Sequence, residues 1–400
     1  MNNTIYITGM GAVTPVGIGV DAYWDSLVSG VCGIDEITGL DTSELTVKRA
    51  GQVREFHPKD YLSMKLVQDL EPYMQYAYVA ALEALQQSGL DPASDRVGIV
   101  MGSALSGICI IGDTNQQLAA SGKAAGPKFL TKAMGNIAAA QFAIQHKIQG
   151  PSLTVSTACS SGGDAVKIAS LLIRSGAADA MIVMAGEAAI CTPLIQSLTK
   201  TGALSKTGES RPFDLNRNGF VLGEGGGAIV LENEASLARH SHSPLAVLLG
   251  CANNTDAFNP VSPDPSGAGA AACMKAAMEE AGIDAKEIGY LNAHGTATKM
   301  GDIAEYKAMK QIFGDDPVRV SSTKGITGHM MGAGGITELI ACIRCMQTGM
   351  IPPNVGFADP DPECPVNVSA ELQQGLDIRT AMSNALGFGG QNSCVIVGRV

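Results

Sequence analysis

The residue best placed for covalent chemistry is Cys159, which follows the apolar run Leu153–Ser156. Small residues make a tight turn there, and an apolar helical pattern begins at or just after the cysteine. The first N–H groups of a helix lack partners within it, and the helix dipole is positive at that end. We therefore expect the helix start to favour the thiolate of Cys159 and the Cys159 N–H to face a developing oxyanion. On this motif alone the alternative is a small buried hydrophobe, which is how most free cysteines behave.

A histidine with hydroxyl neighbours stands at the end of a later apolar run. The strand pattern Gly289–Ala293 delivers His294 to its carboxyl end, where open α/β sheets bind ligands. The hydroxyls of Thr296 and Thr298 suit a polar ligand arm. A strand-end histidine is structural at least as often as it is functional, so this motif is open by itself.

A second histidine lies in the glycine-rich segment Ser321–Gly335, together with Lys324. His329 is in the turn, and Glu338 lies in the helix that follows. The segment lacks the Gly-Lys-Ser/Thr order of a phosphate-binding loop. The alternative for this motif alone is a plain glycine-rich helix entry.

The fourth motif, Asn384–Asn392, holds Phe388 between glycines at the end of a strand. Such a phenylalanine is free to swing, and its backbone can approach a ligand closely; a glycine-rich hairpin is the alternative. A thiol, two imidazoles, a lysine and an aromatic ring all at strand ends are much less probable by chance than any one of them. The four motifs together indicate one site.

Alternating short apolar runs and helical patterns position these residues, which indicates an α/β protein with buried strands. The expected strands are Ile5–Met10, Val97–Met101, Leu153–Ser156, Met181–Ala185, Ala228–Leu231, Leu245–Cys251, Gly289–Ala293, Val318–Ser321, Ala381–Ala385 and Cys394–Val397. The expected helices are Tyr73–Ser88, Cys159–Ser175, Ala268–Ala281, Asp302–Phe313 and Ile336–Gln347.

The order of elements runs similarly twice, which predicts an N-terminal half, residues 1–240, and a C-terminal half, residues 241–400. The polar segment Arg239–Pro244 marks the expected boundary. Two such halves packed together would make five layers, α-β-α-β-α, with a site between the halves.

Composition narrows the class of function. The formal net charge of -11 argues against nucleic acid as the main partner. We expect neither a signal peptide nor a membrane span, because no charge-free apolar run approaches the required length. The ten cysteines are scattered apart from Cys342 and Cys345, which fall in an apolar helical pattern and are expected to be core. A reducing, cytoplasmic location fits best.

In this order the four motifs resemble the β-ketoacyl-acyl-carrier-protein synthases, closest to the type II, elongating branch. The resemblance extends over nearly the whole chain, through Thr8–Gly17, Arg211–Asp214 and Asn218–Gly225. It implies a duplicated thiolase-like fold and an acyltransferase that needs no metal or organic cofactor. The reaction would be decarboxylative Claisen condensation of an acyl thioester with malonyl-acyl-carrier-protein, in fatty acid or polyketide synthesis.

The resemblance also implies roles for single residues. Cys159 would accept the acyl chain, and His294 and His329 would promote decarboxylation and stabilise the enolate. Lys324 would organise the site with Glu338. Further roles carried over are a gating ring and oxyanion N–H at Phe388, pantetheine contacts at Thr296 and Thr298, and an acyl-pocket wall around Ile108 and Ile111. Positions at which family members sometimes hold a monovalent cation correspond to Asn292, Glu338, Ser383 and Asn392.

Partners follow from the same resemblance. Lys65, Lys128 and Lys206 correspond to the basic residues that dock an acidic acyl carrier protein. A homodimer is implied, or a heterodimer with a related subunit. Leu386 and Val261 depart from the family pattern near the pantetheine arm and hint at a specialised polyketide or polyene synthase.

Three other classes fit the residues less well. A thiolase would need a second cysteine where Phe388 stands. A non-catalytic chain-length factor would have lost Cys159, His294 and His329. A papain-like hydrolase has no need of a second histidine and Lys324.

Overall fold

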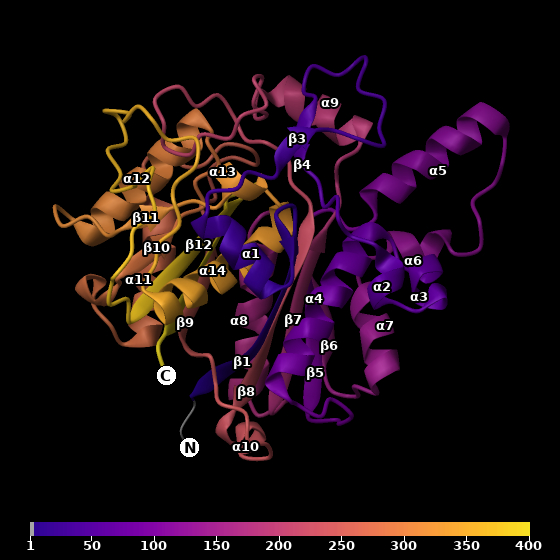
Figure 1. The fold of residues 1–400 in the computed structure, drawn as a ribbon, viewed down its shortest axis with the longest axis horizontal. Helices are drawn as coiled ribbons and strands as arrows, with labels where there is room; N and C mark the ends of the chain where they lie inside the picture. The colour runs from indigo at the N-terminus through magenta and orange to yellow at the C-terminus, as the bar shows by residue number, and fades with distance from the viewer. Residues whose placement is uncertain (1–3) are drawn as a thin grey trace.

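The computed structural model describes residues 4–400 and contains one long sheet built from two similar halves (Figure 1). All ten expected strands are present. Those of the N-terminal half are β1 (Ile5–Thr14), β5 (Val97–Gly102), β6 (Ser152–Val155), β7 (Ala180–Glu187) and β8 (Gly225–Asn233). Those of the C-terminal half are β9 (Ala246–Thr255), β10 (Tyr290–Asn292), β11 (Val320–Ser321), β12 (Thr380–Gly387) and β13 (Gln391–Gly398).

The two halves share one strand topology. The spatial order is β6-β5-β7-β8-β1 in the first half and β11-β10-β12-β13-β9 in the second, which is third, second, fourth, fifth and first along the chain in both. In each half the second strand is parallel to the third and fourth, and the fifth is antiparallel to its neighbours. Antiparallel pairing of β1 with β9 joins the halves into a continuous ladder. The sequence pattern did not predict this junction.

Helices complete five layers. In the middle, α8 (Ser161–Arg174) and α14 (Gly334–Thr348) contact each other and strands of both halves. On the outside, α4 (Pro72–Ser88) and α7 (Ile137–His146) cover the first half, and α11 (Ala268–Ala281) and α12 (Lys299–Phe313) cover the second. The expected α-β-α-β-α arrangement is therefore confirmed.

Glycines allow the two middle helices to meet closely. A Cβ on Gly162 of α8 would lie 2.8 Å from the carbonyl oxygen of Gly332, and one on Gly335 would lie 2.7 Å from the backbone nitrogen of Gly163. Real Cβ atoms essentially never approach backbone atoms this closely. The glycines after Cys159 and His329 therefore let both reactive turns reach one place.

The remaining elements were not assigned from the sequence. They are β2 (Gly17–Ile18), α1 (Val20–Val28), β3 (Ile34–Glu36), β4 (Arg49–Gly51), α2 (Pro58–Tyr61), α3 (Met64–Asp69), α5 (Ile108–Ser121), α6 (Phe129–Ala133), α9 (Thr192–Thr201), α10 (Glu234–Leu237), η1 (Ala285–Glu287), α13 (Lys324–Thr327) and η2 (Met331–Ala333). The helix expected from Cys159 begins at Ser161. Cys342 and Cys345 are buried in α14, as expected. Within residues 4–400, no helix has the length and apolar character needed to cross a membrane.

Candidate active site

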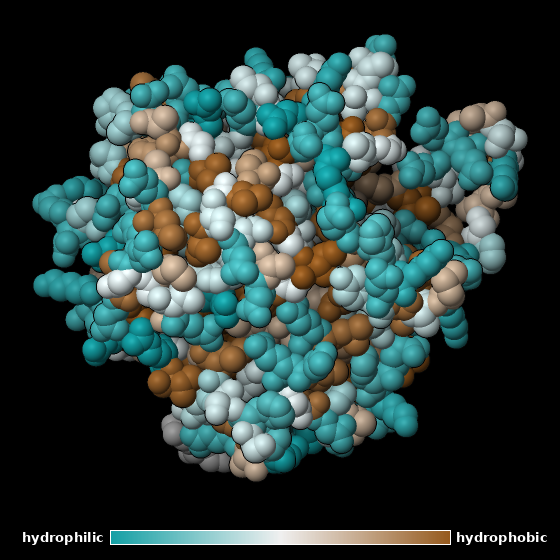
Figure 2. Space-filling view, viewed as in Figure 1, coloured by the Kyte–Doolittle hydropathy of each residue, from teal (hydrophilic) through white to brown (hydrophobic). Residues whose placement is uncertain are grey.

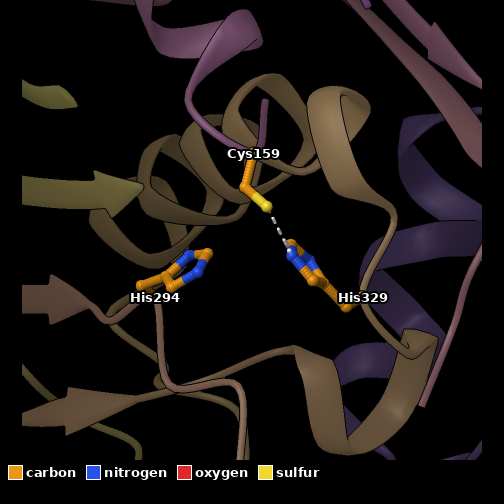
Figure 3. A group of neighbouring side chains, drawn as sticks. All are labelled: Cys159, His294 and His329. Atoms are coloured by element: carbon orange, nitrogen blue, oxygen red, sulfur yellow. Dashed lines mark hydrogen bonds between the residues drawn. The ribbon is translucent and has the colours of Figure 1, made fainter. Parts of the chain in front are cut away.

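A cavity of about 440 Å³ contains the predicted chemistry. Its lining includes Cys159 from the N-terminal half and His294, His329, Thr296, Thr298 and Phe388 from the C-terminal half. In Figure 3 the sulfur points toward the His329 ring, and the His294 ring lies on the other side of the same space. Residues far apart in the sequence thus meet between the two halves.

The turn between β6 and α8 presents the Cys159 thiol. Ala158, directly before it, has a φ of 51°, and the helix starts two residues after the cysteine. The Sγ atom lies 3.0 Å from His329 Nε2. Behind the cysteine, a Cβ on Gly387 would lie 3.1 Å from the Cys159 backbone nitrogen, so only glycine leaves this N–H undisturbed.

Burial works against the thiolate expected for Cys159. It raises the pKa of the thiol to about 12, and the charges of Glu187 and Glu338 raise it further, while Lys324 and the Phe388 N–H lower it. Desolvation thus opposes the positive groups near the sulfur. The His329 Nε2 is placed to take the proton of the thiol.

Backbone contacts position both histidines. The His329 N–H donates to Val221 at 2.7 Å. The N–H groups of His294 and Gly295 donate to the two carboxylate oxygens of Glu305, each at 2.8 Å. The ring centroids of the histidines are 5.2 Å apart and nearly perpendicular.

Both imidazoles are neutral at ordinary pH. Burial, with the positive charge of Lys324, lowers the pKa of each ring well below the usual histidine value. The Nδ1 atoms of both rings are buried without a protein partner. A neutral imidazole can donate its N–H to a ligand carbonyl without carrying charge.

Lys324 and Glu338 form a buried ion pair next to the cavity. Neither residue is in the cavity lining. The structure therefore does not bring the expected substrate ligand Glu338 to the cavity, because its carboxylate is taken up by Lys324. The pair acts on the site through the charge of Lys324, which lowers the pKa of Cys159 and of both histidines.

Polar and apolar groups line the rest of the cavity. The hydroxyls of Thr296 and Thr298 are 3.0 Å apart. Leu386 and Val261, the two departures from the family pattern, also line it. The side-chain amide of Asn392 donates to Asn254 and Asp256 at 2.9 and 2.7 Å. Of the four positions suggested for a monovalent cation, Glu338 and Asn392 are thus committed to other partners.

The expected acyl-pocket residues Ile108 and Ile111 lie outside this cavity. They occupy the first turn of α5, a helix with no buried residue. Figures 1 and 2 show α5 standing out from the body at the upper right. Within one chain the structure therefore does not place these two side chains in the cavity of Cys159.

The three expected docking lysines are exposed but not equivalent. Lys206 follows Thr201–Ala203, which are part of the cavity lining. Lys65 is on α3, and Lys128 precedes α6 with its Nζ 2.6 Å from Asp69. Lys128 therefore offers less free charge to a partner than Lys206 does.

Several residues at the site were not predicted. The ring of Phe220 packs edge-on against His329, with centroids 5.3 Å apart. Asp302 accepts the N–H groups of Phe213 and Ala297, and burial raises its pKa to about 7. Asp302 and Glu305 could have been found from the sequence. They are three residues apart on a helix that directly follows the histidine motif, so both lie on one face of that helix.

The Cys159 sulfur and one nitrogen from each imidazole lie within 4.8 Å of one another, close enough to bind one metal ion. Within residues 4–400 this is the one such group of three possible ligands. Thiolate and imidazole are ligands that zinc prefers. A metal bound there would occupy the sulfur lone pair needed for attack, so the prediction of metal-free chemistry is retained.

Comparison with known proteins identifies the family. Residues 2–236 match the N-terminal domain of β-ketoacyl synthase, and residues 245–358 match its C-terminal domain. The 3-oxoacyl-[acyl-carrier-protein] synthase 2 of Staphylococcus aureus (strain COL) is 37% identical over 405 residues, covering 99% of this chain and 98% of that protein. The synthase 2 of Vibrio cholerae serotype O1 is 35% identical over 410 residues, covering 99% of both.

Solved structures agree with this assignment. The ishigamide ketosynthase/chain length factor matches with a TM-score of 0.95 at 30% identity, covering 99% of both chains. A β-ketoacyl synthase from Burkholderia phymatum STM815 matches with a TM-score of 0.90 at 28% identity, again covering 99% of both. The chain therefore belongs to the β-ketoacyl synthase family and is a condensing acyltransferase of the 3-oxoacyl-acyl-carrier-protein synthase type.

Proposed function

We propose that Cys159 is the nucleophile and that His329 is its proton acceptor. The observation that carries this is the 3.0 Å contact between the Cys159 Sγ and the His329 Nε2, inside a cavity that also contains the second imidazole. A neutral thiol beside a neutral imidazole needs no separate step to become nucleophilic, because the proton moves as the sulfur attacks.

In the first half-reaction the sulfur attacks the carbonyl carbon of an acyl-pantetheine thioester. A new carbon–sulfur bond forms to Cys159, the bond to the pantetheine sulfur breaks, and that sulfur receives the proton held by His329. The N–H groups of Cys159 and Phe388 stabilise the oxyanion. Contact of the Phe388 N–H with the Cys159 sulfur supports this role.

In the second half-reaction His294 and His329 hydrogen-bond the thioester carbonyl of the malonyl group. The bond to the carboxylate breaks, CO₂ leaves, and the electron pair forms an enolate. The enolate carbon then attacks the acyl carbonyl on Cys159 and forms the new carbon–carbon bond. The carbon–sulfur bond to Cys159 breaks, and the sulfur takes a proton from solvent. The low pKa values of both rings support this division, because neutral rings stabilise the enolate without protonating it.

An acyl carrier protein delivers both substrates. Thr296 and Thr298 in the cavity lining suit the amide groups of the pantetheine arm, and Lys206 near the rim suits an acidic carrier surface. One solved structure that the chain matches is a complex of a type II polyketide synthase acyl-carrier protein with its ketosynthase. The fatty acid and polyketide or polyene pathways both fit this chemistry.

The enzyme works as a dimer, with a second copy or a related subunit placed against β6. The β6 strand lies at the end of the sheet with Leu153 46% exposed, and α5 has no buried residue. An unpaired strand edge beside a helix with no buried residue is a surface that a partner chain can cover. Ile108 and Ile111 would become pocket wall there. The two halves, 1–240 and 241–400, supply the thiol and the imidazoles respectively.

Intact-protein mass spectrometry tests the proposal. Incubation with an acyl-carrier protein should add one acyl mass to the enzyme, located on Cys159. Adding malonyl-carrier protein should remove it and give a 3-oxoacyl-carrier product with CO₂. Release of the acyl group to water without a new carbon–carbon bond would overturn the assignment.

A further inference from the structure

The carboxylate of Glu187 is fully buried at the end of β7 and has no ion-pair partner within residues 4–400. Four donors surround it instead. Oε2 accepts the N–H of Ala104 at 2.7 Å and that of Gly332 at 3.3 Å. Oε1 accepts the N–H of Leu105 at 3.1 Å and the hydroxyl of Ser103 at 3.3 Å. A buried carboxylate held in this way is costly unless the donors are fixed.

The donors come from two separate segments of the chain, one leading to α5 and the other carrying His329. Ser103–Leu105 follow β5 and lead directly into α5, where Ile108 begins the expected acyl-pocket wall. Gly332 belongs to the turn that carries His329. The single atom Glu187 Oε2 therefore joins the pocket-wall segment to the histidine turn.

Both segments are tightly constrained at this junction. A Cβ on Gly332 would lie 2.7 Å from the Ala104 nitrogen and 3.0 Å from Glu187 Oε2. Ser106 and Met331 each have a φ of 47°, a conformation that non-glycine residues adopt only when their surroundings enforce it. Hydrogen bonds to Glu187 hold the residues next to both positions, Leu105 and Gly332.

Glu187 also acts on the nucleophile through its charge. It is among the groups that raise the pKa of Cys159, together with Glu338, while Lys324 lowers it and the two imidazoles face the same sulfur. Burial raises the pKa of Glu187 itself to about 7, against the lowering effect of its backbone donors. Tyr73 on α4 is the other titratable group whose pKa the Glu187 charge raises.

We propose that Glu187 is a positioning residue for the condensation, holding the His329 turn at a fixed distance from the segment that leads to the acyl-pocket wall. The inference rests on the proposed function of Cys159 and His329. It assigns Glu187 no contact with substrate.

The test compares Glu187→Gln with Glu232→Gln. Glu232 is an equally buried carboxylate, but it lies in β8 and accepts from Thr8, Ser236 and His240, far along the chain from the site. An amide at position 187 keeps one acceptor atom and loses the other together with the charge. We expect kcat for condensation to fall about tenfold with KM for malonyl-carrier changed less than about threefold. Glu232→Gln should leave both unchanged.

The second measurement is the pH dependence of Cys159 alkylation by iodoacetamide, followed by intact mass. Removing the Glu187 charge should move the profile to lower pH while circular dichroism and the melting temperature stay unchanged; that control is needed because a loss of burial around the thiol would also lower its pKa. Ser103→Ala removes one donor to Glu187 and also the acceptor of the Ser106 N–H. It should lower kcat about twofold and serves if Glu187→Gln fails to fold.

An unchanged kcat in both site variants, or a pH profile that matches the wild type, would overturn the role of Glu187. Failure of the wild type to condense would instead overturn the proposed function, since alkylation of Cys159 does not depend on condensation.

Discussion

The third strands of the two halves, β6 and β11, have equivalent places in the topology but different surroundings. Each is at one end of the sheet, and each is followed by a reactive turn and a middle helix. All of β6 is exposed or half-buried. In contrast β11 is buried, because the chain around residues 367–368 lies beside it, with a hydrogen bond from the Val320 N–H to Asn367.

This difference shows how a duplicated fold divides one reaction. The closed end at β11 leads to Lys324 and His329, whose neutral imidazole depends on complete burial. The open end at β6 leads to Cys159, the proposed acyl acceptor, and this chain leaves β6 itself uncovered. A strand that its own chain buries, such as β11, suits residues that act through their charge or hydrogen bonds. A strand with an open edge, such as β6, suits a site that a partner chain completes.

The largest loss of activity is expected from removing Cys159, the proposed nucleophile that follows the open strand β6. Cys159→Ala should lower condensation by roughly 10⁴-fold or more, because no other thiol lines the cavity to accept the acyl group. Circular dichroism should show an unchanged fold, and intact mass should show no acyl adduct. Normal turnover by this variant would contradict the assignment of the nucleophile to the N-terminal half.

Replacing the two histidines of the C-terminal half should affect the two half-reactions differently. Loss of either ring should slow malonyl decarboxylation by roughly 10²- to 10³-fold, since each supplies one enolate donor. His329→Ala should also slow acylation of Cys159, whereas His294→Ala should not, because only His329 contacts the sulfur. Acylation and decarboxylation are measured separately, with acyl-carrier alone and malonyl-carrier alone. Equal acylation rates in the two variants would be inconsistent with His329 as the proton acceptor.

The open edge of β6 is tested by Leu153→Asp. A charge on the exposed edge should raise the dimer dissociation constant by at least roughly tenfold, measured by sedimentation. Leu215→Asp is the matched control, because Leu215 is 52% exposed and lies outside β6. If Leu153→Asp leaves the sedimentation mass of the dimer unchanged, or if both variants lower it equally, the partner chain binds elsewhere.

The smallest effects are expected from the docking lysines. Lys206→Glu should raise KM for carrier-bound substrates roughly fivefold at low salt, with the effect fading as salt is added. Lys128→Glu should do less, because Lys128 is already paired with Asp69. Steady-state kinetics at two salt concentrations checks this. A larger effect at Lys128 would move the docking surface toward α3 and α6.

Local patterns were sufficient to find the strands and the reactive turns. Cys159, His294 and Phe388 were each identified from a strand that ends in small residues, a signal contained within about ten positions. The ends of the buried strands were also approximately predictable, because apolar runs mark them. For Ile108 and Ile111 the resemblance alone suggested a pocket wall, and this role stays a prediction. Their packing depends on what covers α5.

The sequence by itself determined which groups are available for chemistry and that each is at the end of a strand. Only the tertiary structure decided that His329 rather than His294 contacts the sulfur, that Glu338 faces Lys324 instead of the cavity, and that Glu187 joins two segments of the site. It also buried the Cys159 thiol, which raises the pKa of that group. Helix position is a local property, whereas desolvation depends on every residue that excludes water from the cavity, and these come from both halves of the chain.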